Sequence, residues 1–152
     1  MREPLVSRIL KYALYAAFAL GVAGMVTLPF MLDTYHRIFT DAYFSDPGYR
    51  TFILIFLMTV SVPALWIVLE TILMLRSIPK GPFVTRNVRA LSRIGVISLV
   101  LAAIFFCKCF VYLTFLTFVC GFLLIGFGLF AFTLAALIRQ AVIFREENDL
   151  TI

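Results

Sequence analysis

The longest apolar run of the chain extends from Ile94 to Ile138, and Lys108 is the only charged residue inside it. As a single straight helix this run would extend about 67 Å at 1.5 Å per residue, whereas the hydrocarbon core of a bilayer is roughly 30 Å thick. The run is therefore too long for one membrane crossing and must fold back on itself. Two further apolar stretches precede it, so the pattern predicts a small polytopic membrane protein.

Length, Pro, Gly and charge delimit four predicted spans. They cover about residues 9–32, 51–75, 88–110 and 118–144. The first is retained as a span because its apolar body is longer than the core of a signal peptide and no cleavage site follows it. About Val111 to Phe118 is left for the turn between the last two spans. The predicted fold class is all-α, an integral membrane four-helix bundle that forms a single domain over residues 1–152.

The composition excludes a soluble globular fold. The chain is 63% hydrophobic and 14% charged, which leaves too few polar residues to cover a globule in water. The sequence therefore predicts that the lipid bilayer is the solvent of this protein. The bilayer is also the first binding partner that the sequence predicts.

The distribution of Lys and Arg predicts the orientation of the chain. Of its 13 Lys and Arg residues, only Arg37, Arg50 and Lys108 lie outside the N-terminal tail, the connection after the second span and the C-terminal end. By the positive-inside rule we expect a multi-pass protein of the cell membrane with both termini in the cytoplasm. The net charge of +5 is interpreted as anchoring to anionic lipid head groups, and the basic residues give no evidence of direct nucleic-acid binding.

The connection from Asp33 to Tyr49 carries apolar residues at helical spacing. These residues are Tyr35, Ile38, Phe39, Ala42 and Tyr43. Their spacing predicts a short interfacial helix in this first outer loop, with a ligand-capturing loop as the alternative. Asp33, His36 and Asp41 could be arranged as metal ligands. A single His with loosely spaced carboxylates is not typical of a metal site, so no metal or other cofactor is expected.

Small residues recur at helical spacing on two of the spans. They are Ala13, Ala17 and Gly21 on the first span, and Gly121, Gly128 and Ala135 on the fourth. Each set predicts a smooth stripe along which another helix can approach closely. The spacing leaves open whether these stripes join helices of one chain or of two chains in a homodimer.

Ionisable residues inside predicted spans are the first place to look for function, because each is costly in lipid. Glu70 is the candidate intramembrane ionisable site, and Arg76 or the basic start of the third span could neutralise it. Lys108 lies near the outer boundary, where its long side chain could reach the interface.

The sequence contains no recognisable catalytic constellation. Cys107, Cys109 and Cys120 have no His nearby and are interpreted as packing residues. We find no nucleophile with a base, no Gly-rich phosphate loop and no pair of carboxylates at membrane depth, so the protein is expected to be non-enzymatic.

A row of basic residues opens the third span. Arg86, Arg89 and Arg93 fall on one side of a helix, where they could bind lipid phosphates or an acidic partner. The acidic end of the same chain is one partner of suitable charge. Its acidic residues are Glu146, Glu147 and Asp149.

The turn at Pro79–Phe83, followed by Asn87 and Leu91, and above all the tail Glu146–Ile152, resemble bacterial four-span membrane proteins of domain-of-unknown-function family 2975. Members of that family are often encoded beside a very small helix-turn-helix regulator of the Cro/C1 type. The resemblance therefore implies that the membrane protein controls or tethers such a regulator. It supplies no catalytic residues.

Two functional hypotheses follow. In the first, the protein is a regulatory or tethering partner of a small helix-turn-helix transcriptional regulator, held by residues 81–93 and by the tail from Arg145 to Ile152. In the second, it is a compact dimeric small-molecule transporter or protective membrane protein. That class requires a carboxylate deep in the translocation path, and Glu70 lies close to the expected cytoplasmic boundary.

Overall fold

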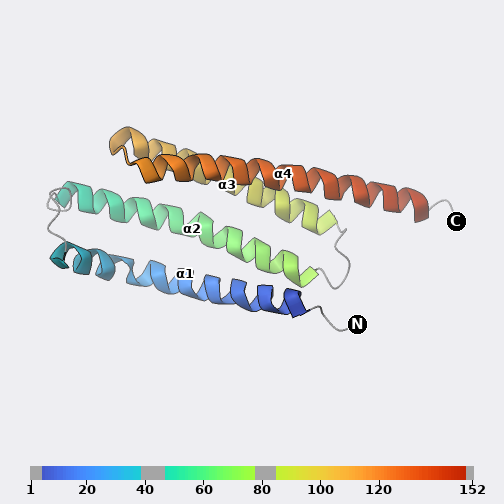
Figure 1. The fold of residues 1–152 in the computed structure, drawn as a ribbon, viewed down its shortest axis with the longest axis horizontal. Helices are drawn as coiled ribbons and strands as arrows, with labels where there is room; N and C mark the ends of the chain where they lie inside the picture. The colour runs from blue at the N-terminus through green and yellow to red at the C-terminus, as the bar shows by residue number, and fades with distance from the viewer. Residues whose placement is uncertain (1–4, 39–46, 78–84, 150–152) are drawn as a thin grey trace.

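The computed structural model describes residues 5–38, 47–77 and 85–149 of the chain. These residues form four helices, and the described part contains no strand (Figure 1). The helices are α1 (Leu5–Ile38), α2 (Pro47–Ser77), α3 (Thr85–Val111) and α4 (Phe115–Asp149). The all-α prediction is confirmed, and each predicted span lies within one of the helices.

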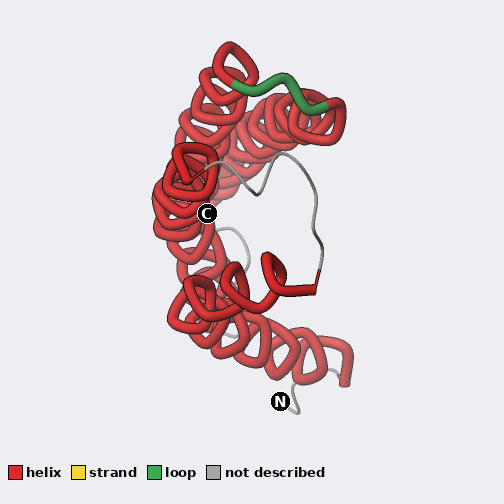
Figure 2. The backbone as a smooth tube through the Cα atoms, turned by 90° about the vertical axis from the view of Figure 1, so that its left-hand side faces the viewer, coloured by secondary structure: helices red, strands yellow, loops and turns green. Residues whose placement is uncertain are grey.

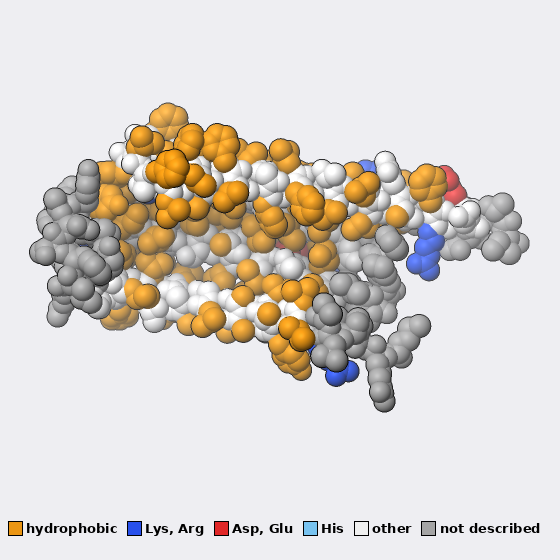
Figure 3. Space-filling view, in the orientation of Figure 1, with side chains coloured by type: hydrophobic (Ala, Val, Ile, Leu, Met, Phe, Trp, Pro, Cys, Tyr) orange, Lys and Arg blue, Asp and Glu red, His pale blue; other side chains and the backbone are white. Residues whose placement is uncertain are grey.

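All four helices are long and apolar enough to cross a membrane, over Arg8–Thr34, Gly48–Arg76, Thr85–Val111 and Phe115–Arg145. Many of their large apolar side chains point outward, and several of these are more than 70% exposed, among them Leu20, Phe30, Phe110 and Phe115. Hydrophobic side chains spread along the visible face of the helices, while most visible charged groups lie near one end (Figure 3). Since lipid tails are the solvent that such a surface requires, the protein is a multi-pass membrane protein.

The helices alternate in direction, so the start of α1 and the end of α4 lie at the same end of the molecule (Figure 1). We call this the basic end. Its cationic residues on the described helices are Arg8, Lys11, Arg76, Arg86, Arg89, Arg93, Arg139 and Arg145. An even number of spans agrees with the expected location of both termini on one side. That this side is the cytoplasm stays a prediction.

The four helices form an open arc, which Figure 2 shows from one end. Among the described residues, contacts between helices occur only between chain neighbours, α1 with α2, α2 with α3 and α3 with α4. Half of the buried positions among the described residues are on α3, which packs against both α2 and α4, and Ser98 on that helix is fully buried. Helices α1 and α4 are the two edges of the arc.

Glycine permits a close approach of the two backbones between α3 and α4. A Cβ atom on Gly95 would lie 3.1 Å from the carbonyl oxygen of Gly128, and a Cβ atom on Gly128 would lie 3.1 Å from the carbonyl oxygen of Gly95. Gly121 and Ala135 are buried along the same side of α4. The small-residue stripe of the fourth span therefore joins two helices of one chain.

Fewer of the small residues of α1 lie at a contact with another helix. A Cβ atom on Gly21 would lie 2.7 Å from Cδ2 of Leu65 on α2, so Gly21 lies at the contact between α1 and α2. Ala13 and Ala17, by contrast, are exposed. The predicted stripe on the first span is thus a helix contact only at its last position.

Two predictions about the connections need correction. The turn between α3 and α4 consists of residues 112–114, not Val111 to Phe118, because Phe118 N–H donates to the carbonyl of Thr114 at 3.1 Å and starts α4 early. At the first connection, α1 continues as far as Ile38, so part of the predicted interfacial helix belongs to this long helix. Residues 39–46 lie outside the described part, and the interfacial helix is not confirmed.

Candidate functional site

Glu70 lies near the basic end of α2 and is paired with Arg93 on α3. Its Oε1 atom is 3.0 Å from Nη1 of Arg93 and accepts a longer hydrogen bond, of 3.4 Å, from the indole N–H of Trp66 one turn earlier. The Glu70 side chain is only 5% exposed, whereas the Arg93 side chain is 57% exposed. The carboxylate is thus held at the α2–α3 contact, and its guanidinium partner reaches it from the outside.

Arg76 was expected to be a possible partner of Glu70, but it binds α1 instead. Its Nε–H donates to the hydroxyl of Tyr15 at 2.7 Å, and its guanidinium carbon lies 5.4 Å from the centre of the Tyr15 ring. Two arginines of the basic end therefore connect neighbouring helices, Arg76 joining α1 to α2 and Arg93 joining α2 to α3.

The remaining arginines of the predicted basic row, Arg86 and Arg89, are exposed. Arg89 borders a hollow of about 380 Å³ between α3 and α4, and a second hollow of about 430 Å³ adjoins it. We call the two hollows together the α3–α4 groove. The residues that line both hollows are Val88, Arg139 and Ile143. The groove thus combines apolar side chains with two guanidinium groups.

Arg89 is among the residues predicted from the sequence, but the side of this groove that α4 supplies is not. In the sequence, Arg139 is only one of the basic residues of the C-terminal end. The available signal was the spacing of Arg139, Val142 and Ile143 at i, i+3 and i+4, which places them on one face of a helix. That this face would meet the start of α3 follows from the fold and not from the spacing.

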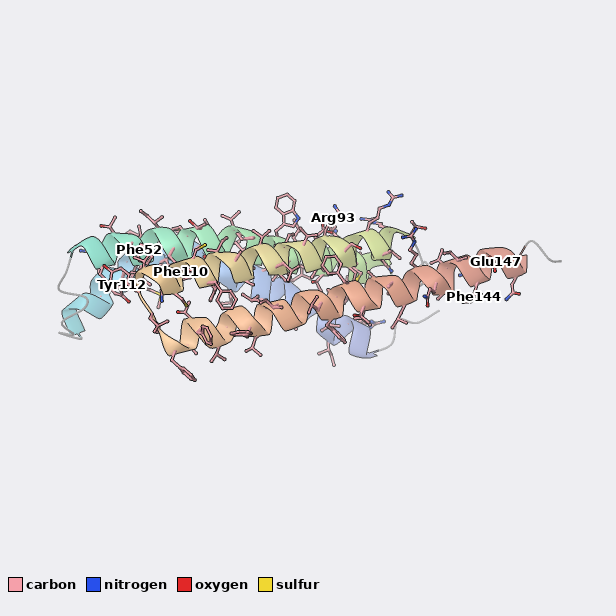
Figure 4. The ribbon with its side chains drawn as sticks, turned by 90° about the horizontal axis from the view of Figure 1, so that it is seen from above. Phe52, Arg93, Phe110, Tyr112, Phe144 and Glu147 are labelled. Atoms are coloured by element: carbon pink, nitrogen blue, oxygen red, sulfur yellow. The ribbon has the colours of Figure 1, made fainter. Side chains whose placement is uncertain are left out.

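Helix α4 projects beyond the other helices at the basic end (Figure 1). Glu147 is exposed and lies on this projecting part, well away from Arg93 (Figure 4). The structure therefore does not bring Arg93 and Glu147 together. Glu146 and Asp149 lie within α4, but their side chains are outside the described part.

At the opposite end, Lys108 is buried, with only 6% of its surface exposed. Its Nζ atom donates hydrogen bonds to the hydroxyls of Thr117 at 2.8 Å and Thr114 at 3.2 Å. Instead of extending outward, this side chain turns toward the start of α4, and its predicted reach to the membrane interface stays a prediction. It turns inward because the short turn places two threonine hydroxyls within its reach.

Further contacts at this opposite end hold α1, α2 and the turn together. Asp33 on α1 forms an ion pair with Arg50 on α2. The ring of Tyr112, in the turn after α3, lies 4.8 Å from the ring of Tyr49 and 5.2 Å from that of Phe52, centre to centre (Figure 4). Asp33 is thus engaged by a cation. The other residues considered as metal ligands, the His36 side chain and Asp41, lie outside the described part.

The three cysteines are free thiols. Cys109 and Cys120 are partly buried, which agrees with a packing role, but Cys107 is exposed. Cys107 is thus not a buried packing residue, and it lines an open hollow between α2 and α3.

A comparison with known proteins gives one match. Residues 38–152 match the model of a family described as protein of unknown function (DUF2975). The match covers α2, α3 and α4 and begins at the last residue of α1. No curated protein and no solved structure matches the chain. The chain belongs to the DUF2975 family of proteins of unknown function.

Proposed function

We propose that this protein is a non-enzymatic regulatory membrane protein whose basic end binds a small helix-turn-helix DNA-binding regulator and tethers it to the membrane. The observation that carries this proposal is the α3–α4 groove. It has apolar walls at Val88 and Ile143 and guanidinium groups at Arg89 and Arg139. Exposed Arg86 lies on the same helix as Arg89.

This combination of groups suits a protein partner. Arginine is enriched in protein interfaces, and apolar pockets beside it accept the side chains that anchor a partner. Positive charge on both walls favours an acidic surface and speeds its association. The projecting end of α4 adds a second surface beyond the arc (Figure 1). By the positive-inside rule this end lies in the cytoplasm, where such a regulator is found.

The partner class comes from the family, whose members are often encoded beside a Cro/C1-type regulator. In this proposal the basic residues bind the regulator or the lipid head groups, and the regulator binds the DNA. The chain itself binds no nucleic acid in this proposal.

The alternative of a dimeric transporter has less support. Its carboxylate, Glu70, is buried at a helix contact and is already paired with Arg93 of the same chain. The stripe on α4 that could have joined two chains is used within one chain. Proton release that depends on a substrate and disappears in Glu70→Gln would restore this alternative.

The experiment is co-purification of the protein from membranes with the small helix-turn-helix regulator that this proposal expects to be encoded beside it. We expect the regulator to be in the membrane fraction with the wild-type protein and largely in the soluble fraction with Arg89→Gln/Arg139→Gln. The matched control is Arg8→Gln/Lys11→Gln, which removes two charges from the same end but leaves the groove intact, and it should keep the regulator.

Two further outcomes bear on this proposal. If the regulator stays soluble beside wild-type protein, or if both double variants retain it equally, the groove is not its binding site. Deletion of residues 146–152 tests the predicted role of the tail separately. If the distribution of the regulator is unchanged, the tail is not needed for binding, and the groove alone remains the proposed site.

A further inference from the structure

Lys108 is a buried cation whose described hydrogen-bond partners are all neutral. Two of its three N–H donors bind the hydroxyls of Thr114 and Thr117, and the ammonium nitrogen lies 5.5 Å from the centre of the Phe56 ring. Hydroxyls and an aromatic face stabilise a cation only in part. A buried charge of this kind normally has a counter-ion.

No carboxylate with a described side chain supplies that counter-ion. Asp33 is paired with Arg50, and Glu70 is paired with Arg93. Glu147 lies at the other end of the molecule (Figure 4). Among the described residues, Lys108 therefore adds an unbalanced positive charge to the end opposite the basic end.

An apolar cavity of about 290 Å³ lies beside this charge, between α2 and α3, and Lys108 is one of its lining residues. We call it the α2–α3 cavity. Its other lining residues are Phe52, Ile55, Phe56, Thr59, Ile104, Cys107 and Val111. It is open toward the outer surface of the helices, since Ile55 is 59% exposed and Cys107 is also exposed. In a membrane that surface faces lipid.

The position of Lys108 along α3 places it at the depth of lipid head groups. It lies three residues before the end of α3 at Val111, which corresponds to about 4.5 Å along the helix axis. A molecule lying in the α2–α3 cavity would therefore have its apolar part along the spans and its polar part near the membrane surface.

We propose that the α2–α3 cavity is a binding site for an anionic phospholipid, whose phosphate is the counter-ion of Lys108 and whose acyl chain packs against Phe56 and Ile104. The hydroxyls of Thr114 and Thr117 accept hydrogen bonds from Lys108 and still have their own hydrogens to donate to a phosphate oxygen. A zwitterionic lipid is less suitable, because its own positive group offsets the attraction to Lys108.

The test uses the full-length protein in phosphatidylcholine nanodiscs that contain a minor fraction of phosphatidylglycerol. After extraction into mild detergent, native mass spectrometry counts the lipids retained by each protein molecule. We expect wild type to retain phosphatidylglycerol in preference to phosphatidylcholine. Lys108→Met should weaken that retention by on the order of tenfold or more, since a hydrogen bond to a charged group is lost.

Matched variants separate this site from general attraction of anionic lipid. Lys108→Arg keeps the charge and should restore retention, whereas Arg50→Met removes a cation from the same end without lining the cavity and should change nothing. Ile55→Trp fills the cavity while it leaves Lys108 in place. It should reduce retention as Lys108→Met does, and it keeps the test decisive if the Lys108 variant fails to fold.

Several results would overturn the proposal. Equal retention of phosphatidylglycerol by wild type and Ile55→Trp would exclude the cavity, and retention of both lipids without preference would exclude the role of the charge. A site that binds a free fatty acid but no phospholipid would also contradict it, because the occupant would then be a different molecule.

Discussion

Glu70 and Lys108 are the two buried ionisable side chains among the described residues, and they have different kinds of partner. Glu70 has a cation at 3.0 Å that is more than half exposed. Lys108 has neutral hydroxyls and an aromatic ring. The free energy required to keep each group in the membrane therefore depends on what the structure places around it and not on its depth alone.

We predict that the two halves of the Glu70–Arg93 pair are unequal in their effect on stability. Arg93→Gln leaves a buried carboxylate without its cation and should lower the free energy of unfolding by about 3 kcal/mol. Glu70→Gln leaves an exposed guanidinium that water can solvate, so the loss should be about 1 kcal/mol. Unfolding in mixed micelles, followed by helical circular dichroism, measures both values. Equal losses would mean that Glu70 is not buried as described.

At the scale of residues, the sequence predicted that Glu70 lies inside a span, because the helical rise gives the depth of a side chain. It also predicted the region of the cation that neutralises Glu70, because the charge pattern shows which cations are available. It did not predict the surroundings of Lys108. Those depend on the length of the turn after α3, and an apolar sequence without Gly or Pro does not define where that turn begins and ends.

At the scale of elements, the α3–α4 contact depends on two glycines that face each other. Gly95 and Gly128 let the two backbones approach, and a side chain on either would meet the carbonyl of the other at 3.1 Å. Backbone cannot move aside as a flexible side chain can. Close approach is a main source of helix association in lipid, where burial of apolar surface gives little.

We predict that Gly128→Ala lowers the free energy of unfolding by about 1–2 kcal/mol, because the added methyl group overpacks this contact. Gly126→Ala is the matched control on the same helix, since nothing lies within 4 Å of a Cβ atom at Gly126. It should not lower the stability. Thermal unfolding in detergent compares the two, and a control that is as unstable as Gly128→Ala would show that the effect comes from the helix itself.

The spacing of small residues on α4 predicted that another helix approaches there, and this is correct for Gly121, Gly128 and Ala135. The spacing did not identify α3 as the neighbour. Any helix with a matching small residue could have filled that role, and Gly95 lies outside the sets that the spacing identified. The identity of the neighbour follows only from the three-dimensional arrangement.

At the scale of the whole molecule, hydropathy and length predicted four helices, and each predicted span lies within one of the helices of the described part. They could not predict an open arc in place of a closed bundle. Side chains that face lipid and side chains that face another helix are both apolar, so the pattern along the chain does not separate them.

The alternation of the helices makes a prediction about topology. A reporter that is active only in the cytoplasm should be active at either end of the chain, because an even number of spans returns the chain to its starting side and the basic end is expected inside. A reporter in the connection between α1 and α2 should be inactive. Opposite results at the two termini would contradict the four-span topology and, with it, the proposed access of a cytoplasmic regulator.

The open arc also has a consequence for biosynthesis. A closed ring of helices is complete only when the last helix meets the first, so one face of its first helix stays uncovered until the ribosome finishes the chain. Here, over the residues that the structure describes, each helix contacts only its chain neighbours, so α3 gains α4 as a partner after α2. Every helix that leaves the translocation machinery can therefore dock at once on the one made just before it, and assembly can proceed in the order of translation.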